Sequence, residues 1–184
     1  MAAARYDGVA IALHWTTVVL VAVLLTTGLT VAWGYEGSLK NTLYAVHKAT
    51  GLLTFFVMAF RLTRRLMRGT PPLPETVPPT MRRVSGVWHR LLYAVLLAMP
   101  VTGYVYVVAG GYPVEVLNAL GVPPLLEKYM PLSKASERVH RTLAYILLTL
   151  ISGHVAAVVW HDVVRRDGVL RRMLPGARTG AAGS

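Results

Sequence analysis

The sequence predicts an all-α fold, an integral membrane four-helix bundle with both termini in the cytoplasm. Of the 184 residues, 54% are hydrophobic and only 15% are charged, whereas about 25% of the residues of an average soluble domain are charged. So apolar a chain would expose large hydrophobic patches in water, which makes lipid its natural solvent. The apolar residues form four long segments, and most basic residues lie in the connections on one side of them, as in a multi-pass membrane protein.

The first two spans are expected at about residues 9–33 and 41–62. The first segment contains no Lys, Arg, Asp or Glu over 25 residues. As a helix it is about 37 Å long, enough to cross a bilayer core of about 30 Å. It is too long for the apolar region of a signal peptide and no Ala-x-Ala site closes it, so we interpret it as a retained span. The second segment is apolar apart from His47 and Lys48 near its start.

The last two spans are expected at about residues 87–109 and 138–164. Arg90 is the one charged residue of the third span, and Pro100 is expected to bend it because proline removes a backbone hydrogen bond. The centre of the fourth span carries His154 as its one ionisable group.

Two of the connections are rich in proline and glycine. Residues 70–80 contain five prolines and are expected to be extended. Residues 110–136 are interrupted by Gly-Gly, Pro-Pro and Met-Pro, and the short apolar pieces between these breaks predict one or two short helices on the membrane surface. Residues 1–175 are therefore expected to form one four-span domain, followed by a disordered tail over residues 176–184.

The basic residues give the predicted orientation. Thirteen of the 19 Lys and Arg residues lie in the N-terminal segment, in residues 61–90 or after His161, and six lie in the two opposite connections. By the positive-inside rule, the side with thirteen faces the cytoplasm. The net charge of +11 is thereby accounted for by membrane topology, and we expect no nucleic-acid partner.

The sequence excludes several other kinds of chemistry. It contains no cysteine, which excludes disulfides, thiolate metal sites, Fe–S clusters and the covalently attached haem of c-type cytochromes. It also lacks His-Glu-x-x-His, P-loop and Gly-x-Gly-x-x-Gly motifs. Glu137 and His140 resemble one arm of a carboxylate di-iron site, but such a site needs further glutamates inside the bundle, and the spans contain none between their ends. Any reaction must therefore be carried by cofactors within the membrane.

All six histidines lie within the predicted spans or at their ends, where ionisable residues are costly and usually functional. His140 and His154 are 14 residues apart on the fourth span. On a helix this spacing is about 40° short of four full turns and rises about 21 Å, so both rings project from one face near opposite membrane surfaces. We therefore expect two separate centres, each completed by a histidine of another span.

Partners for these rings lie at matching depths, His47 with His140 at the outer end and His14 with His154 at the inner end. Two imidazoles that face each other across a bundle suit the axial positions of haem iron and leave no position for oxygen, which favours electron transfer. Taken singly, each of these residues could instead be a hydrogen-bonded structural histidine. The haem propionates need cations, which otherwise serve as anchors at the span ends: Lys48, Arg138 and Arg141 outside, and Arg61, Arg64 and Arg90 inside.

Two further histidines lie near the predicted cytoplasmic surface. His161 is seven residues beyond His154 on nearly the same helix face, where it could bond a quinone carbonyl or carry a proton. Equally, it could be an interfacial histidine beside Asp162. His89 could transfer a proton, form a structural hydrogen bond, or replace His14 or His154 as a ligand.

Several motifs resemble the prokaryotic cytochrome b561 family. They are the ALHW stretch around His14, Val46-His47-Lys48, the MPVTGY stretch of the third span, the pattern from His140 through Ser-Gly-His154 to His161, and RDGVLRRMLP after the fourth span. The resemblance covers about residues 5–175. It implies four helices that hold two b-type haems, one between His14 and His154 and the other between His47 and His140.

Within that family the chain resembles most the small stand-alone superoxide oxidases. This resemblance implies an inner-membrane enzyme that takes electrons from superoxide at the periplasmic surface and passes them to ubiquinone, with His161 as the quinone contact. The same fold also serves as a cytochrome b subunit that anchors a dehydrogenase or hydrogenase, which is the alternative function. A haem-free transporter that uses its histidines as a proton relay is a second alternative, from a different class.

Overall fold

The computed structural model describes residues 5–73 and 77–176, and these ranges contain helices and no strand. The long helices are α1 (Gly8–Ala32), α2 (Lys40–Arg68), α3 (Pro79–Ala109) and α5 (Met130–Val159), and the short α4 (Glu115–Ala119) lies between α3 and α5. The π-helical turn η1 (Trp160–Arg165) continues α5, and the 3-10 turn η2 (Leu170–Met173) follows. Four helices are long and apolar enough to cross a membrane, which confirms the predicted four-helix membrane fold. The orientation of the termini stays a prediction.

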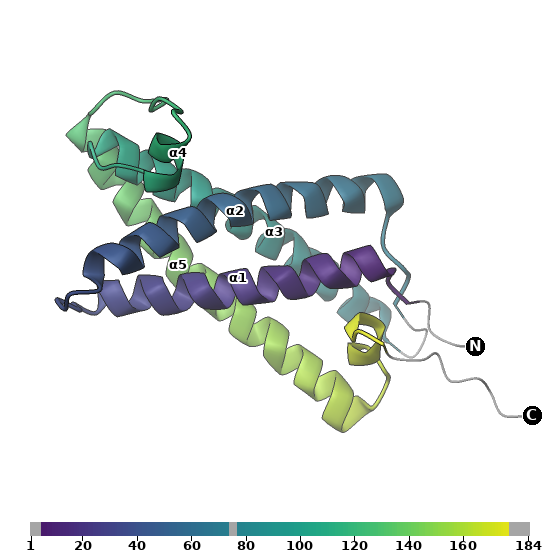
Figure 1. The fold of residues 1–184 in the computed structure, drawn as a ribbon. Coiled ribbons are helices and arrows are strands. Elements are labelled where there is room, and N and C mark those ends of the chain that lie inside the picture. The colour runs from purple at the N-terminus through teal and green to yellow at the C-terminus, as the bar shows by residue number, and fades with distance from the viewer. Residues whose placement is uncertain (1–4, 74–76, 177–184) are drawn as a thin grey trace, which may run out of the picture.

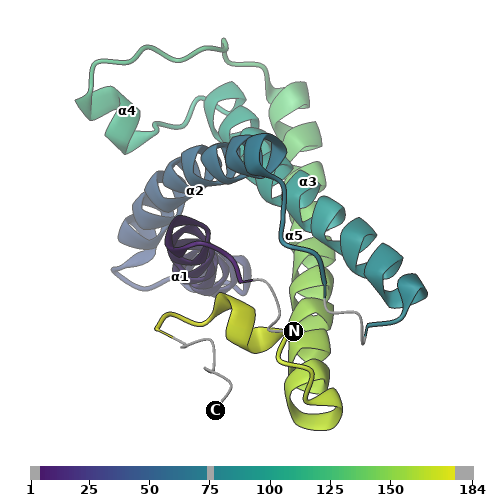
Figure 2. The same cartoon turned by 90° about the vertical axis from the view of Figure 1, so that its right-hand side faces the viewer.

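The long helices form two antiparallel pairs, α1 with α2 and α3 with α5 (Figure 1). The two pairs lie side by side, and α2 packs against α3 (Figure 2). Both ends of the described chain lie at one end of the bundle, which we call the terminal end. The short α4 lies at the opposite end, which we call the α4 end (Figure 1).

Local sequence signals explain where three of the helices begin or end. The carboxylate of Asp7 accepts a hydrogen bond from the N–H of Ala10 (2.9 Å) and so caps α1. Gly69 ends α2 with a φ of 67°, a left-handed conformation that glycine adopts without steric cost. Pro79 begins α3, at a helix position where the missing N–H of proline leaves no hydrogen bond unmade.

The helices α2, α3 and α5 extend beyond the predicted spans. α2 ends at Arg68 rather than near residue 62, α3 begins at Pro79 within the predicted extended connection, and α5 begins at Met130 rather than near residue 138. The predictions counted apolar residues, whereas Arg, Lys and Met also favour helix and continue it past the apolar segment. α3 runs as one helix through Pro100, where the sequence predicts a bend. Residues 177–184, most of the predicted disordered tail, lie outside the described residues.

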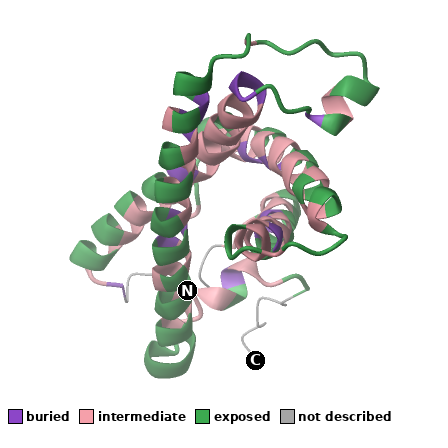
Figure 3. Cartoon of the chain, turned by 90° about the vertical axis from the view of Figure 1, so that its left-hand side faces the viewer, coloured by how far each residue is buried: buried purple, intermediate pink, exposed green. Residues whose placement is uncertain are grey.

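Few side chains are buried, and the main core cluster lies between α3 and α5. Val95, Leu147 and Leu150 form this cluster, and Trp88 and Leu92 pack against it. Many other large apolar side chains are exposed on the helices, so exposed and intermediate residues dominate the view in Figure 3. An apolar outer surface of this extent fits helices that face lipid, and it leaves the interior of the bundle to the polar side chains described next.

Candidate functional site

One histidine pair lies toward the α4 end of the bundle. His47 belongs to α2 and His140 to α5, and their ring centroids are 6.3 Å apart with an interplanar angle of 78°. We call these two residues the α4-end pair. Because α2 and α5 belong to different antiparallel pairs, this contact joins the two halves of the bundle.

Each ring of the α4-end pair is held by a threonine of a neighbouring helix. Oγ1 of Thr27 on α1 lies 3.1 Å from Nδ1 of His47, and because this hydroxyl already donates to a carbonyl of its own helix, it accepts the Nδ1–H. Nδ1 of His140 lies 3.0 Å from the carbonyl oxygen of Met99 and 3.1 Å from Oγ1 of Thr102. Both rings therefore carry a proton on Nδ1, which leaves Nε2 unprotonated, the form in which a histidine binds a metal.

A glycine follows each of these threonines and lets the imidazole approach the helix closely. A Cβ on Gly28 would lie 2.9 Å from Cε1 of His47, and a Cβ on Gly103 would lie 3.1 Å from Cε1 of His140. A larger residue at either position would therefore displace the ring. The two Thr-Gly sequences fix the α4-end pair by hydrogen bonding and by close packing.

A second histidine pair lies toward the terminal end. His14 of α1 and His154 of α5, which we call the terminal-end pair, have ring centroids 6.4 Å apart and an interplanar angle of 66°. The ring of His89 on α3 lies 5.4 Å from that of His154. Nδ1 of His89 donates to the carbonyl of Ser85 at 2.7 Å. Three imidazoles from three helices therefore meet at this end.

The terminal-end pair lies beside an arginine side chain inside the bundle. Nη2 of Arg61 on α2 lies 3.3 Å from Nδ1 of His14, and its Nη1 donates to Oγ1 of Thr17 at 2.9 Å. The guanidinium also lies over the ring of Tyr93, 5.6 Å from the centroid. Because a guanidinium can only donate, Nδ1 of His14 is the acceptor and the ring proton is assigned to Nε2. This tautomer is the opposite of that in the α4-end pair, so His14 can bind a metal through Nε2 only when Arg61 turns to another acceptor and the ring proton moves to Nδ1.

The two pairs have the spacing that an axially ligated metal requires. Each pair offers two nitrogen ligands, one from each helix, which suits a metal whose remaining ligands come from a macrocycle. Metal–nitrogen bonds of about 2 Å on both sides place opposite imidazole centroids about 6 Å apart. The observed separations of 6.3 and 6.4 Å fit this value. The 5.4 Å between His89 and His154 is too short for an intervening metal.

Two of the predicted propionate cations lie toward the terminal end. Arg61 lies beside His14, as described above. Arg64 forms an ion pair with Asp7 (2.7 Å). The hydrogen bond from Arg64, together with that from the N–H of Ala10, holds the pKa of the Asp7 carboxyl below its usual range. Arg64 therefore also secures the start of α1 against α2.

Three more of the predicted cations lie toward the α4 end, whereas the sixth, Arg90, is exposed on α3 and its Nε donates to the carbonyl of Gly86 at 3.2 Å. Lys48 donates to the carbonyl of Pro113 (2.7 Å) and forms an ion pair with Glu115 (2.6 Å), which ties the connection around α4 to α2. Although partial burial opposes ionisation, these contacts lower the pKa of the Glu115 carboxyl. Arg138 and Arg141 are exposed on α5.

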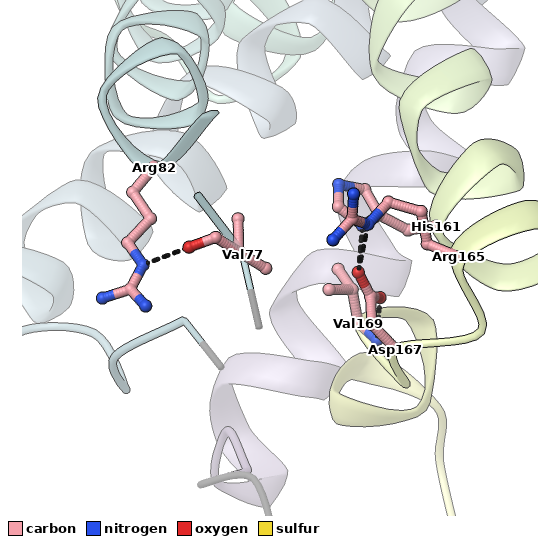
Figure 4. A network of polar contacts seen from close by, with 6 residues as sticks. All are labelled: Val77, Arg82, His161, Arg165, Asp167 and Val169. Carbon is pink, nitrogen blue, oxygen red and sulfur yellow. Dashed lines mark hydrogen bonds and ion pairs between the residues drawn. The ribbon is translucent and has the colours of Figure 1, made fainter. Parts of the chain in front are cut away.

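The sixth histidine, His161, lies in η1 at the terminal end. Its Nδ1 is 2.6 Å from Oδ2 of Asp167 (Figure 4). The ion pair is thus with a residue that the sequence analysis does not single out, whereas the adjacent Asp162 is exposed.

The supporting residues are the part of the site that sequence reasoning missed. Thr27, Gly28 and Thr102 contact histidines that are 19 to 38 residues away in the chain, so no spacing rule for a single helix identifies them. A Thr-Gly dipeptide recurs in three of the apolar spans, at residues 27–28, 50–51 and 102–103, and this repeat is the one signal that could have indicated them, although residues 50–51 do not contact a histidine ring in this way. Asp167 approaches His161 only because the chain turns back at Arg166, which has a φ of 53°.

Comparison with known proteins places the chain among membrane cytochromes. The family described as prokaryotic cytochrome b561 matches residues 5–176. Cytochrome b561 homolog 2 of Escherichia coli (strain K12) is 28% identical over 172 residues, which cover 92% of this chain and 91% of that protein. Cytochrome b561 homolog 1 of the same strain is 26% identical, over 93% of this chain and 97% of that protein. A protein of Yersinia pestis named probable superoxide oxidase CybB is 23% identical, over 95% of this chain and 98% of that protein.

Proposed function

The chain belongs to the prokaryotic cytochrome b561 family, and on this premise we propose that it is a di-haem cytochrome that carries electrons across the membrane to a quinone. It is a multi-pass protein of the inner membrane, and its family implies haem b as cofactor. One observation carries the proposal: two imidazole pairs with separations of 6.3 and 6.4 Å lie toward opposite ends of the same bundle. Each pair takes one histidine from α5, so a single helix connects the two.

The histidines would hold two haems b, one between His47 and His140 and the other between His14 and His154. The haems supply one-electron redox chemistry. A haem held by two imidazoles would exchange single electrons and would not bind a substrate at its iron. The part of the protein is to orient the imidazoles, and Thr27 and the glycines beside the α4-end rings serve this role.

Cationic side chains support the propionates in this proposal. Arg61 is the candidate at the terminal end, because it lies within 3.3 Å of His14 and a carboxylate is a stronger acceptor for a guanidinium than a neutral imidazole nitrogen. Arg64 is the second candidate there. Lys48, Arg138 and Arg141 are the candidates at the α4 end.

We propose superoxide as the electron donor at the α4 end, which the positive-inside rule assigns to the periplasm. A relative at 23% identity carries the name probable superoxide oxidase. The two connections on this side hold six basic residues against four glutamates, and a net charge of +2 attracts an anion. Each superoxide gives up one electron and becomes O2.

Ubiquinone is the proposed acceptor at the terminal end, with His161 as the contact to one of its carbonyl oxygens. Two electrons and two protons convert the quinone to the quinol, so two superoxide molecules are consumed for each quinone. In this proposal the protons come from the cytoplasm, which the positive-inside rule assigns to the terminal end.

Stopped-flow mixing of the oxidised, purified protein with superoxide tests this function. We expect a b-type haem spectrum with about two haems per chain, haem reduction by superoxide, and reoxidation when ubiquinone is added. Superoxide dismutase must abolish the reduction. If superoxide does not reduce the haems, superoxide is not the donor. The alternative function, a cytochrome b subunit of a dehydrogenase or hydrogenase, is then favoured, and co-purification with such a partner tests it. If the protein carries no haem, the histidine-relay transporter remains.

A further inference from the structure

The chain leaves the membrane helix α5 through an unusual backbone. Residues Trp160–Arg165 form the π-helical turn η1, and Arg166 then takes a φ of 53°. π-helical turns are frequently found at functional sites, and a positive φ is unfavourable for a residue other than glycine. Together these two features reverse the chain, so that Asp167 returns to His161.

The contact between these two side chains is short and shielded. Nδ1 of His161 lies 2.6 Å from Oδ2 of Asp167, and the exposed fractions of the side chains are 17% and 5%. The second carboxylate oxygen, Oδ1, accepts a hydrogen bond from the N–H of Val169 at 3.4 Å (Figure 4). In this contact the carboxylate accepts from Nδ1 of His161, and a hydrogen bond to a carboxylate is stronger when its donor carries a positive charge.

Two arginines are drawn with this pair in Figure 4. Nε of Arg165 lies 3.6 Å from the same carboxylate oxygen, which adds to the stabilisation of its negative charge. Arg82 of α3, drawn across from the pair in Figure 4, donates instead to the carbonyl of Val77 at 2.8 Å.

The returning segment is fastened to the rest of the terminal end. Arg172 of η2 is 4% exposed and donates to the carbonyls of Pro71 and Pro72 at 3.0 and 2.8 Å. Nε1 of Trp15 on α1 donates to the carbonyl of Met173 at 2.8 Å. These contacts hold the segment that carries Asp167 against α1 and against the connection before α3, next to the terminal-end pair.

We propose that Asp167 is a positioning residue that keeps His161 protonated, so that Nε2–H donates to a carbonyl oxygen of the quinone. A neutral ring that donates through Nδ1 has only a lone pair on Nε2, and two acceptors repel one another. When the quinone has received its electrons, the Nε2 proton passes to the reduced oxygen, and the neutral imidazole left beside Asp167 takes up a proton from the cytoplasm. This inference rests on the proposed function, because it presupposes that His161 contacts the quinone.

The test compares Asp167→Asn with Asp162→Asn in the purified, haem-loaded protein, with a short-chain ubiquinone as probe. The amide introduced by Asp167→Asn keeps an acceptor for Nδ1 but removes the charge, whereas the control removes the neighbouring exposed carboxylate. For Asp167→Asn we expect about tenfold weaker binding of the quinone to the oxidised protein, measured by equilibrium dialysis without turnover. We also expect a lower kcat, while haem reduction by the donor is unchanged. The control is expected to stay within about twofold of the wild type for each quantity.

The outcomes separate this inference from the proposed function. If His161→Phe abolishes quinone reduction while Asp167→Asn stays within about twofold of the wild type, only the role of Asp167 is overturned. If His161→Phe itself has no effect, the quinone assignment fails, and the inference fails with it. A measurement on the unaltered protein covers the case in which Asp167→Asn does not fold. The 15N spectrum of labelled histidine in the reduced protein must show both nitrogens of His161 protonated near neutral pH, and a neutral ring contradicts the proposal.

Discussion

The α4-end pair and the terminal-end pair have nearly the same ring separation but different surroundings. The α4-end rings are held by neutral groups, namely threonine hydroxyls, a backbone carbonyl and two glycines. The terminal-end pair lies beside a guanidinium and a third imidazole, and the ion pair of His161 and Asp167 occupies the same end of the bundle. The same ligand geometry is therefore built twice, once with neutral contacts and once among groups that carry charge or protons.

This difference fits the chemistry proposed for the two ends. Oxidation of superoxide releases an electron and no proton, so the entry end needs rigid ligands more than proton carriers. Reduction of a quinone consumes two protons. The proposed function places this reduction at the terminal end, where His89, His161 and Asp167 also lie. Four sets of substitutions sharpen or break this comparison.

The largest effect is expected from Gly28→Ala, which tests the close packing of the α4-end pair. The new Cβ would lie 2.9 Å from Cε1 of His47, so the ring must move away from its position. We expect the α4-end haem to bind about 100-fold more weakly while the terminal-end haem is retained, measured as haem transfer to an apoprotein acceptor. Gly86→Ala on α3 is the control, because it lies away from the α4-end pair and a Cβ there meets only Nη2 of Arg90 at 4.0 Å. Equal haem loss in both variants would contradict the account.

A smaller effect is expected from Thr27→Val, which removes the acceptor for Nδ1–H of His47. Loss of such a supporting hydrogen bond typically weakens metal binding by about tenfold. Thr102→Val is expected to weaken haem binding less, because Nδ1 of His140 keeps the carbonyl of Met99 as an acceptor at 3.0 Å. The same haem-transfer measurement gives both values. A larger loss for Thr102→Val than for Thr27→Val would show that these hydrogen bonds are not what orients the rings.

The charge at the terminal end is tested by Arg61→Gln. A positive charge near a haem favours its reduced form, so we expect the potential of the terminal-end haem to fall by about 60 mV, a tenfold change for a one-electron couple. The α4-end haem is expected to keep its potential. Redox titration of the two haems measures this, and equal shifts in both would contradict the separate surroundings described here.

The smallest effect is expected at the ion pair of Asp7 and Arg64. The pKa of Asp7 is lowered in the folded protein from 3.8, so the pair stabilises the fold above this pKa and loses its contribution as the pH falls through the folded value. Asp7→Asn is therefore expected to lower the Tm slightly at a pH of about 7, and this difference is expected to shrink as the pH falls toward about 3. A difference in Tm that persists at the lower pH would assign the effect to the helix cap rather than to the ion pair.

The sequence predicted what depends on a single helix. Apolar length identified four spans, and the spacing of His140 and His154 placed two rings on one face of the last long helix. Matching depths also indicated the two histidine pairings, but no sequence pattern indicated the other contacts that depend on how helices cross. Thr27 meets His47, and Arg64 meets Asp7 rather than standing free, only because α1 packs against α2 in one particular register.

The ends of the last span show a second limit of sequence reasoning. The fourth span was predicted to run to about residue 164, but neither the π-helical turn nor the positive φ of Arg166 has a clear sequence signal. These backbone features are stabilised by tertiary contacts such as those of Arg172. The partner of His161 could therefore not be chosen between Asp162 and Asp167 from the sequence.

The haem content of double alanine variants tests the central claim of two separate histidine pairs most directly. His47→Ala combined with His140→Ala removes both ligands of one proposed site, so about one haem per chain must remain, as in either single variant. His47→Ala combined with His14→Ala damages both sites, so both haems must be lost. If the first combination removed both haems, or the second retained one, the pairing described here would be wrong.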